Sequence, residues 1–250
     1  MVKILLNGCL GKMGQAVEAC VNEREDIMIA CGVDIAEGDK TYPVYNCFVD
    51  VQETPDVIVD FSNPLVLDDM LSFAAEKKIP VIICTTGFSE AQVQKIKDTS
   101  NTIPVFYSGN MSLGINVLIA LSKMAAKVLY NSFDVEIIEK HHNLKLDAPS
   151  GTALMIADAI NDEVGGTQYV YDRHAYRKRR EHSEIGIHSI RGGTIVGEHE
   201  VIFAGHDEVV SLKHQAQSKG VFAAGAVNAA VFMKDKPAGL YDMTDVLKNA

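Results

Sequence analysis

The first half of the chain alternates short apolar runs with amphipathic stretches. Apolar runs at 2–6, 27–33, 56–61, 80–86 and 103–108 predict buried strands. Helices are expected between them at 14–22, 63–78 and 89–100. Buried strands separated by helices of this length need crossover connections, so the pattern predicts a parallel sheet with helices on both faces.

The pattern changes near residue 113. Apolar residues recur at helical spacing from Val117 to Val128 and predict a long helix, and an alternating strand follows at 133–137. A second helix is expected from Thr152 to Val164. Runs at 184–193, 194–205 and 207–216 predict strands joined by glycine-rich turns. This second unit is expected to be mixed and largely antiparallel, with an apolar helix from about 220 packing back on the first domain.

Composition narrows the class of protein. The 250 residues are 47% hydrophobic, which is enough for one substantial core or two modest ones. No apolar run is long enough to span a membrane, and the N-terminus lacks the apolar core of a secretion signal, so a cytoplasmic protein without membrane contact is expected. The five cysteines lie in the first third without CxxC pairing, which favours reduced thiols over disulfides or zinc.

The net charge of −10 argues against a nucleic-acid partner, because phosphate backbones favour positively charged surfaces. The stretch RHAYRKRR at 173–180 is a local basic exception. It either faces an anionic ligand or forms a solvated loop.

A glycine loop follows the first predicted strand. Gly8, Gly11 and Gly14 lie between that strand and a helix, although their spacing differs from the usual G-x-G-x-x-G. Small residues there let backbone N–H groups approach a pyrophosphate at the helix N-terminus. Asp34 ends the second strand, where a carboxylate accepts hydrogen bonds from the adenosine ribose and repels a 2′-phosphate. The loop therefore predicts a dinucleotide site that favours NADH; a tight turn beside an exposed aspartate is the alternative.

Two further loops follow strands of the same sheet. CTTGF at 84–88 and SGNMS at 108–112 offer small residues with accessible backbone groups. Ligands of doubly wound sheets bind beyond the carboxyl ends of the strands. We therefore expect the nicotinamide beside these two loops.

The segment HHNLKLDAPSGTA gathers titratable side chains before a predicted helix start. His141 can give or take protons near neutral pH. Lys145 can donate to a carboxylate or to a substrate nitrogen. Ser150, Gly151 and Thr152 open the helix, where backbone N–H groups bind anions. Together these groups would hold a small dianionic substrate and protonate it.

Two other interpretations of this segment stay open. His141 and His142 could bind a metal, but adjacent residues of a strand point to opposite sides and no further ligand completes a set, so no metal is expected. Alternatively the histidines are polar residues at a strand end and Asp147 caps the helix.

The segment EKHHNLKLDAPSGTA resembles the signature of the 4-hydroxy-tetrahydrodipicolinate reductase family, also called dihydrodipicolinate reductases. The resemblance continues in order through GKMG, VDFSNP, TTGF, GNMSLGIN, EIGIHSIRGGTIVGEHEVIFAG and GAVNAA. It therefore covers nearly the whole chain. Cys84 stands where the family commonly has glycine.

The resemblance implies an α/β fold, with an N-terminal Rossmann-type parallel sheet and a second α+β domain. Residues 1–112, completed by 219–250, would bind the dinucleotide. Residues 113–218 would bind the substrate and form much of a homotetramer interface. The family uses NADH or NADPH to reduce a dianionic cyclic imine, 4-hydroxy-tetrahydrodipicolinate, to tetrahydrodipicolinate in the diaminopimelate route to lysine.

The resemblance also implies roles for individual residues. His141 would be the proton donor and acceptor, and Lys145 a second proton donor. His142, Gly151 and Thr152 would contact the substrate together with Ser150. The residues expected to contact the cofactor are Gly8, Cys9, Leu10, Gly11, Lys12, Met13, Asp34, Cys84, Thr85, Thr86, Ser108, Gly109, Asn110 and Met111.

Two rival functions remain at this point. Another amino-acid-related NAD(P) dehydrogenase could reuse the fold, or the chain could be a noncatalytic dinucleotide-binding regulator. A regulator would not require the set of His141, His142, Lys145 and Ser-Gly-Thr, and no DNA-binding helix pair is evident.

Overall fold

The computed structural model describes residues 1–175 and 177–249. The chain forms two compact units. Unit 1 comprises Met1–Leu113 and the C-terminal segment from Lys219, and unit 2 comprises Gly114–Ser218. Within the described ranges, no helix has the length and apolar character needed to cross a membrane.

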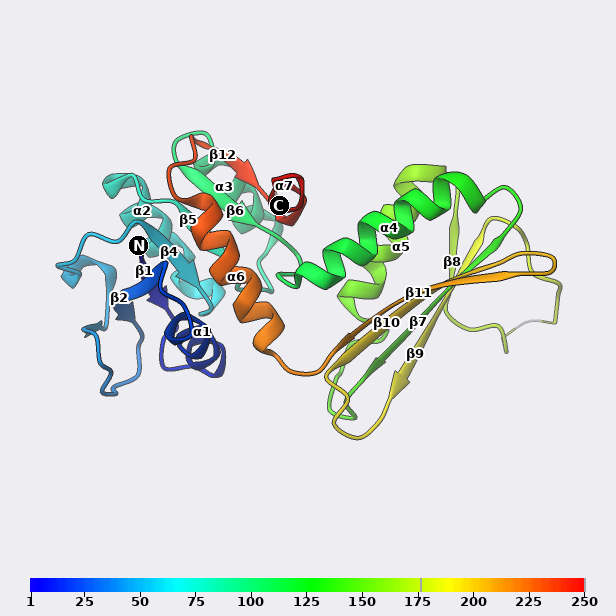
Figure 1. The fold of residues 1–250 in the computed structure, drawn as a ribbon, viewed down its shortest axis with the longest axis horizontal. Coiled ribbons are helices and arrows are strands. Elements are labelled where there is room, and N and C mark those ends of the chain that lie inside the picture. The colour runs from blue at the N-terminus through cyan, green and yellow to red at the C-terminus, as the bar shows by residue number, and fades with distance from the viewer. Residues whose placement is uncertain (176, 250) are drawn as a thin grey trace. The chain divides into compact units, whose positions relative to one another are not determined.

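Unit 1 contains a seven-stranded sheet in the order β12-β6-β5-β4-β1-β2-β3 (Figure 1). Its strands are β1 (Val2–Asn7), β2 (Ile27–Val33), β3 (Val44–Tyr45), β4 (Val57–Asp60), β5 (Val81–Ile83), β6 (Pro104–Tyr107) and β12 (Gly239–Tyr241). All neighbouring strands pair in parallel. The predicted parallel sheet is therefore confirmed, and the two short edge strands β3 and β12 are additions that the apolar pattern did not indicate.

Helices cover both faces of this sheet. They are α1 (Lys12–Asn22), α2 (Leu67–Lys77), α3 (Glu90–Thr99), α6 (Gly220–Met233) and α7 (Met243–Lys248), with 3-10 turns at Phe48–Asp50 and Pro64–Val66. Because side chains alternate along a strand, Ile4 and Leu6 enter the core beneath α1 and α6, whereas Leu5 enters the core beneath α2 and α3. Both cores are therefore built from the same apolar strands.

The C-terminal segment completes unit 1. Helix α6 packs against α1 and contacts the strands of the sheet, and β12 pairs with β6. Gly225 of α6 packs directly against the loop after β6, where an added Cβ would lie 1.7 Å from the carbonyl oxygen of Met111. Gly225 therefore sets how closely α6 approaches this backbone.

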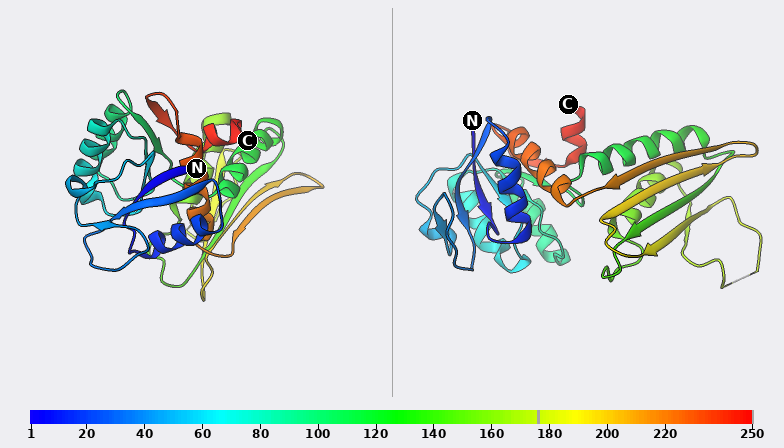
Figure 2. Two further views of the ribbon diagram at one scale, coloured as in Figure 1. Left: turned by 60° about the vertical axis from the view of Figure 1, so that its left-hand side comes forward. Right: turned by 60° about the horizontal axis from the view of Figure 1, so that its bottom comes forward.

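Unit 2 is a five-stranded sheet in the order β11-β10-β7-β9-β8. Its strands are β7 (Asp134–His141), β8 (Gln168–Val170), β9 (Glu184–Arg191), β10 (Gly197–Ala204) and β11 (Val209–Ala216). Helices α4 (Leu113–Leu129) and α5 (Gly151–Val164) pack on one face, as Figure 2 shows. The predicted α+β second domain is confirmed.

The expectation of a largely antiparallel sheet is wrong. Only β10 runs antiparallel to its neighbours β7 and β11, whereas β9 pairs in parallel with both β7 and β8. The chain leaves β7, crosses through α5 to the parallel edge strand β8, and then enters β9 between β8 and β7. A crossover connection of this kind joins parallel strands.

The basic stretch is bound to carboxylates of the sheet. Arg173 pairs with Glu136 and Glu184 at 3.3 and 2.7 Å, and Arg180 pairs with Asp134 and Glu136 at 2.6 and 3.1 Å. These two guanidinium groups therefore hold the chain against β7 and β9. Tyr176 lies outside the described residues.

We expect Gly225→Ala to destabilise unit 1 by about 2 kcal/mol or more, because the methyl group would meet fixed backbone. The clash should exceed the gain of about 1 kcal/mol that alanine brings to a helix interior. Urea unfolding measures the change. Ala224→Ser, at an exposed position of the same helix, should change stability by less than about 0.5 kcal/mol. A Gly225→Ala protein as stable as the wild type would contradict this packing.

Candidate active site

Strand β7 directs a polar pair inward at its end. Val135 and Ile137 pack in the core, and the same alternation turns Glu139 and His141 to the helix-covered face. Both side chains are buried, and Glu139 is 0% exposed. The strand therefore places a carboxylate and an imidazole side by side at the edge of the core.

The Glu139 carboxylate receives hydrogen bonds from three segments. Arg191, at the end of β9, donates from Nη1 to Oε2 at 2.8 Å and from Nη2 to Oε1 at 2.6 Å. The backbone N–H of Ser150 donates to Oε1 at 3.2 Å. Burial raises the pKa of Glu139, but hydrogen bonds led by those of Arg191 outweigh it and lower this pKa to about 2. Glu139 is therefore an anion throughout the neutral pH range.

His141 lies against this carboxylate. Its Nδ1 is 2.6 Å from Oε2 of Glu139. Burial lowers the pKa of His141, and the positive charges of Lys145 and Arg191 act in the same direction. These effects exceed the opposing effect of Glu139, so the pKa of His141 lies below the ordinary histidine value. A neutral imidazole is favoured in the free protein.

A second buried histidine neighbours His141. His199 on β10 is 3% exposed, and its ring centroid lies 5.2 Å from that of His141 in an edge-to-face arrangement. Its Nε2 lies 3.0 Å from Oγ of Ser150. Burial, with the charge of His141 second, lowers the pKa of His199 to about 4. His199 is therefore a neutral, buried hydrogen-bonding group.

The start of α5 carries the other expected substrate groups. Ser150, not Asp147, is the N-cap, because its Oγ accepts from the N–H of Ala153 at 3.2 Å. Asp147 instead pairs with the Lys145 ammonium at 2.8 Å. Lys145, and to a lesser degree the N–H of Gly151, lower the pKa of Asp147. A carboxylate therefore already lies between this ammonium and the helix N-terminus.

The remaining expected residues differ in their surroundings. His142 is half-buried, and its Nδ1 is a buried atom without a hydrogen-bond partner. Gly151 is exposed, and a Cβ added there would meet nothing within 4 Å. Thr152 is half-buried in the first turn of α5. Unit 2 thus gathers the predicted residues His141, His142, Lys145, Ser150, Gly151 and Thr152 in a single strand-to-helix segment.

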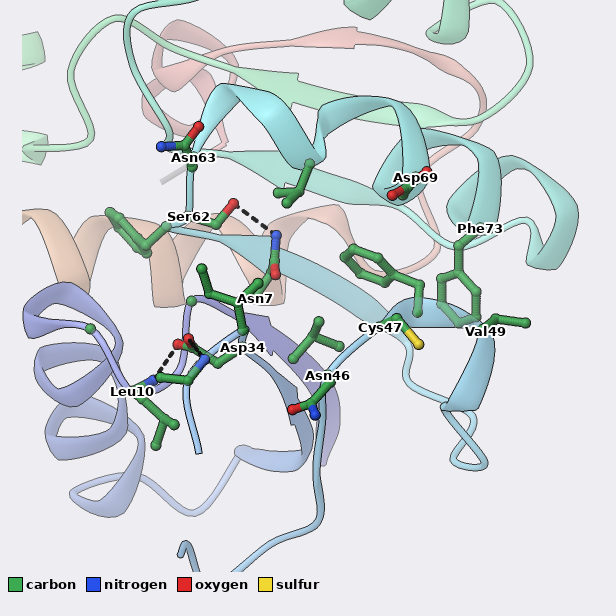
Figure 3. A pocket seen from close by; sticks show the side chains of 18 of the residues that line it. Asn7, Leu10, Asp34, Asn46, Cys47, Val49, Ser62, Asn63, Asp69 and Phe73 are labelled. Carbon is green, nitrogen blue, oxygen red and sulfur yellow. Dashed lines mark hydrogen bonds between the residues drawn. The ribbon is translucent and has the colours of Figure 1, made fainter. Parts of the chain in front are cut away.

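Unit 1 contains a cavity of about 820 Å³ at the carboxyl ends of β1, β2 and β4 (Figure 3). Asn7, Asp34 and Ser62 line its strand side. Further lining residues come from the 3-10 turn at 48–50 and from α2, among them Phe48, Asp69, Phe73 and Glu76. Apolar rings and carboxylates share this surface, and the lining includes neither lysine nor arginine.

Two glycines of the loop are packed closely against neighbouring backbone. Gly8 has a φ of +79°, and a Cβ there would lie 2.4 Å from the carbonyl oxygen of Phe61. At Gly14 a Cβ would lie 2.3 Å from the carbonyl oxygen of Gly8, so both residues are required by the fold. Gly11 is the N-cap of α1 and provides no side-chain cap. First-turn N–H groups of an uncapped helix suit a pyrophosphate.

Asp34 is tied to this loop. Its Oδ2 accepts from the N–H of Leu10 at 2.9 Å, and its Oδ1 accepts from the N–H of Ala36 at 3.0 Å (Figure 3). Each carboxylate oxygen has two acceptor sites, so both can still accept a ribose hydroxyl. The residues present therefore fit the adenosine end of a dinucleotide.

Only part of the expected cofactor set lines the cavity. Gly8, Leu10, Gly11 and Asp34 do so. The Cys9 thiol is buried beside Gly32, whereas Lys12 is exposed. The residues of the loops after β5 and β6 do not line the cavity, although Thr85 accepts a hydrogen bond from the N–H of the lining residue Ser62 at 2.8 Å. These loops contain Cys84, Thr85, Thr86, Ser108, Gly109, Asn110 and Met111.

Sequence reasoning missed several residues of both sites. Glu139 and His199 are not among the residues that the sequence indicates for the candidate active site. Arg191 is considered there only as a charge that attracts the dianionic substrate, and its pairing with Glu139 is not expected. The two-residue alternation from Val135 to His141 could have indicated that Glu139 shares the face of His141. No comparable pattern points to Phe48, Phe73 or Asp69.

Family models and known proteins match this chain over nearly its whole length. A family model described as "Dihydrodipicolinate reductase, N-terminus" matches residues 2–111, and one described as "Dihydrodipicolinate reductase, C-terminus" matches residues 114–247. A 4-hydroxy-tetrahydrodipicolinate reductase of Caldanaerobacter subterraneus is 50% identical over 249 residues, covering 99% of both chains. One of Clostridium tetani is 48% identical over 251 residues, covering 100% of this chain and 98% of the relative.

Solved structures share the fold. A dipicolinate-bound dihydrodipicolinate reductase from Paenisporosarcina sp. TG-14 matches with a TM-score of 0.80 and 23% identity, covering 97% of each chain. An amine dehydrogenase from Mycobacterium smegmatis matches with a TM-score of 0.65 and 11% identity, covering 96% of this chain and 94% of the other.

We expect His199 to make the stability of unit 2 depend on pH. The pKa of His199 is about 4 in the folded state and ~6.5 in the unfolded state, so the unfolded state binds more protons between these values. Stability should therefore be full above about pH 6.5 and fall by about 3 kcal/mol as pH drops toward 4.

Urea unfolding at about pH 7 and pH 5 tests this dependence. His199→Gln should unfold with a smaller difference between the two pH values than the wild type. His206→Gln, in the exposed turn between β10 and β11, is the matched control and should retain the wild-type difference. An equal pH dependence in His199→Gln and wild type would contradict the assignment.

Proposed function

This chain belongs to the dihydrodipicolinate reductase family, and we propose how its two sites carry out the reaction. It is an NAD(P)H-dependent oxidoreductase that reduces 4-hydroxy-tetrahydrodipicolinate to tetrahydrodipicolinate in lysine biosynthesis. A noncatalytic regulator or a different dehydrogenase is not favoured. The observation that carries the proposal is the buried pair of Glu139 and His141 beside Lys145 and the N-terminus of α5.

The substrate is a cyclic dicarboxylate, and the start of α5 suits one of its carboxylates. Lys145 already holds the Asp147 carboxylate at 2.8 Å, and the N–H of Gly151 contributes to the same site. Asp147 is exposed, so a substrate carboxylate can take its place. We assign His142, Ser150 and Thr152 to the same pocket. Ser150 shapes it as the N-cap.

We assign proton transfer to His141 and Lys145. NADH or NADPH, when bound, supplies the hydride. The 4-hydroxyl group leaves as water, which gives the conjugated ring that accepts the hydride. Hydride addition to this ring leaves negative charge on the substrate, which a nearby acid must neutralise. His141 donates this proton, and the Lys145 ammonium supplies positive field and a second proton source. Glu139 stays ionised and stabilises the protonated imidazole.

The cofactor is proposed to bind at the cavity of unit 1. Its pyrophosphate would lie at the first turn of α1, which Gly11 begins, and its ribose would lie against Asp34. Leu10 lines the same surface, and Cys9, Lys12 and Met13 complete the loop. The nicotinamide end is assigned to the loops after β5 and β6, with Cys84, Thr85, Thr86, Ser108, Gly109, Asn110 and Met111.

NADH is the proposed preferred cofactor. Asp34, Asp69 and Glu76 line the cavity, and no lysine or arginine does. A ribose 2′-phosphate would bring two further negative charges against these carboxylates. A ribose diol instead donates hydrogen bonds to Asp34.

We also propose a cytoplasmic homotetramer that forms through unit 2. No described helix packs on the outer face of its sheet, where Ile190 and Val209 are exposed. Apolar side chains on an open sheet face favour association.

Steady-state reduction tests the function. We expect the protein to oxidise NADH rapidly when the preceding synthase generates the substrate from pyruvate and aspartate semialdehyde. His141→Gln should lower kcat about 10²–10³-fold because the acid is lost, while the Kd for NADH stays close to that of the wild type. The readouts are loss of nicotinamide absorbance and dinucleotide titration. Unchanged turnover in His141→Gln would remove the proposed acid, and absent oxidation by folded wild type would remove the reductase.

The cofactor preference depends on Asp34. Asp34→Ala should narrow the ratio of kcat/KM for NADH to that for NADPH, because the variant loses a ribose acceptor and a charge that repels the 2′-phosphate. Glu37→Ala, an exposed carboxylate nearby in sequence that does not line the cavity, is the control and should keep the wild-type ratio. An unaltered ratio in Asp34→Ala would contradict the assigned ribose contact.

A further inference from the structure

We propose that Glu139 is a positioning residue that fixes His141 as the tautomer protonated on Nδ1, so that Nε2 is the nitrogen that transfers the proton to the substrate. This inference rests on the proposed function, because it specifies how the acid of that reaction is oriented. Glu139 acts through His141 and does not itself touch the substrate.

The tautomer follows from the hydrogen bonds on Glu139. A carboxylate only accepts, and its two oxygens offer about four acceptor sites. Oε1 accepts from Arg191 and from the N–H of Ser150, and Oε2 accepts from Arg191. Nδ1 of His141 reaches Oε2 at 2.6 Å, so it must be the donor. The Ser189 side chain on β9 adds a further hydrogen bond to the same carboxylate, so its acceptor sites are all used and the imidazole has one orientation.

Arg191 weakens the tendency of the Glu139 carboxylate to keep the His141 imidazole protonated. An unpaired buried carboxylate would favour a permanently charged imidazolium. Arg191 cancels that charge with a bidentate contact, and Lys145 adds positive charge from the loop before α5. His199 on β10 presents a neutral ring on the remaining side. His141 can therefore both take up a proton and release it, and a dianionic substrate beside Lys145 would favour the uptake.

The backbone of β10 passes close to Nε2 of His141. At Gly197 on β10, an added Cβ would lie 3.1 Å from Nε2 of His141. A methyl group would therefore crowd the nitrogen that we assign to proton transfer. The glycine keeps this position open without any need for an unusual backbone conformation.

Glu139→Gln tests the inference. A glutamine amide has one acceptor oxygen and one donor group, so it cannot serve Arg191, Ser150 and His141 together. We expect kcat to fall about 10²–10³-fold, with a much smaller change in KM and an unchanged Kd for NADH. Glu136→Gln is the matched control, because Glu136 lies on the opposite face of β7 and also contacts an arginine and a histidine. It should keep the wild-type kcat.

Nitrogen NMR of histidine-labelled protein supplies the readout that a merely structural role would not change. In the wild type, His141 should carry its proton on Nδ1 at neutral pH, and in Glu139→Gln both tautomers should be populated. An Nε2-protonated His141 in the wild type would overturn the inference. So would a wild-type kcat in Glu139→Gln.

Gly197→Ala gives an independent test in case Glu139→Gln does not fold. The methyl group should lower kcat by at least about 10-fold while the NMR tautomer stays as in the wild type. Unchanged turnover would show that Nε2 is not the working nitrogen. Failure of the proposed function is distinguishable, because wild-type protein would then lack reductase activity whatever tautomer His141 adopts.

Discussion

The candidate active site depends on one buried carboxylate. Glu139 is fully buried, and an ion in such a place is stable only if its hydrogen bonds are satisfied. Its donors come from the end of β7, the end of β9 and the start of α5. Removing one partner of a buried pair commonly costs roughly 3–5 kcal/mol, so the same contacts that orient His141 also hold these three segments together. The stability of this part of unit 2 and the orientation of His141 are thus coupled through one residue.

The N-termini of α1 and α5 differ in how they are capped. Helix α1 begins at Gly11 without a side-chain cap, so its first turn is left for a ligand. Helix α5 is capped by Ser150, and Asp147 of the same chain lies before it with Lys145. The first arrangement suits a pyrophosphate. The second holds an internal carboxylate, which a substrate carboxylate would replace in the proposed mechanism.

The sequence patterns predicted the features that depend on residues close to one another in the chain. The apolar runs gave the parallel sheet, and the glycine loop and Asp34 meet at one cavity because both follow adjacent strands. The contact between Arg191 and Glu139 could not be foreseen, since the two residues are 52 positions apart in the sequence and meet through the register of β7 and β9. The cavity lining from Phe48 and Phe73 likewise depends on how a 3-10 turn and α2 pack. Tertiary register, rather than propensity, decides such contacts.

Charge in unit 2 is divided between the two faces of β7. On the outer face, Glu136 forms ion pairs with Arg173, Arg180 and His188. The two arginines of the basic stretch therefore bind the sheet. On the inner face, Glu139 and Arg191 cancel each other and burial keeps His199 neutral. Among the charged groups described around His141, Lys145 is left with only an exposed partner, Asp147. In the proposed mechanism, a dianionic ligand would therefore meet positive charge at Lys145, and the ligand's own charge would favour protonation of His141.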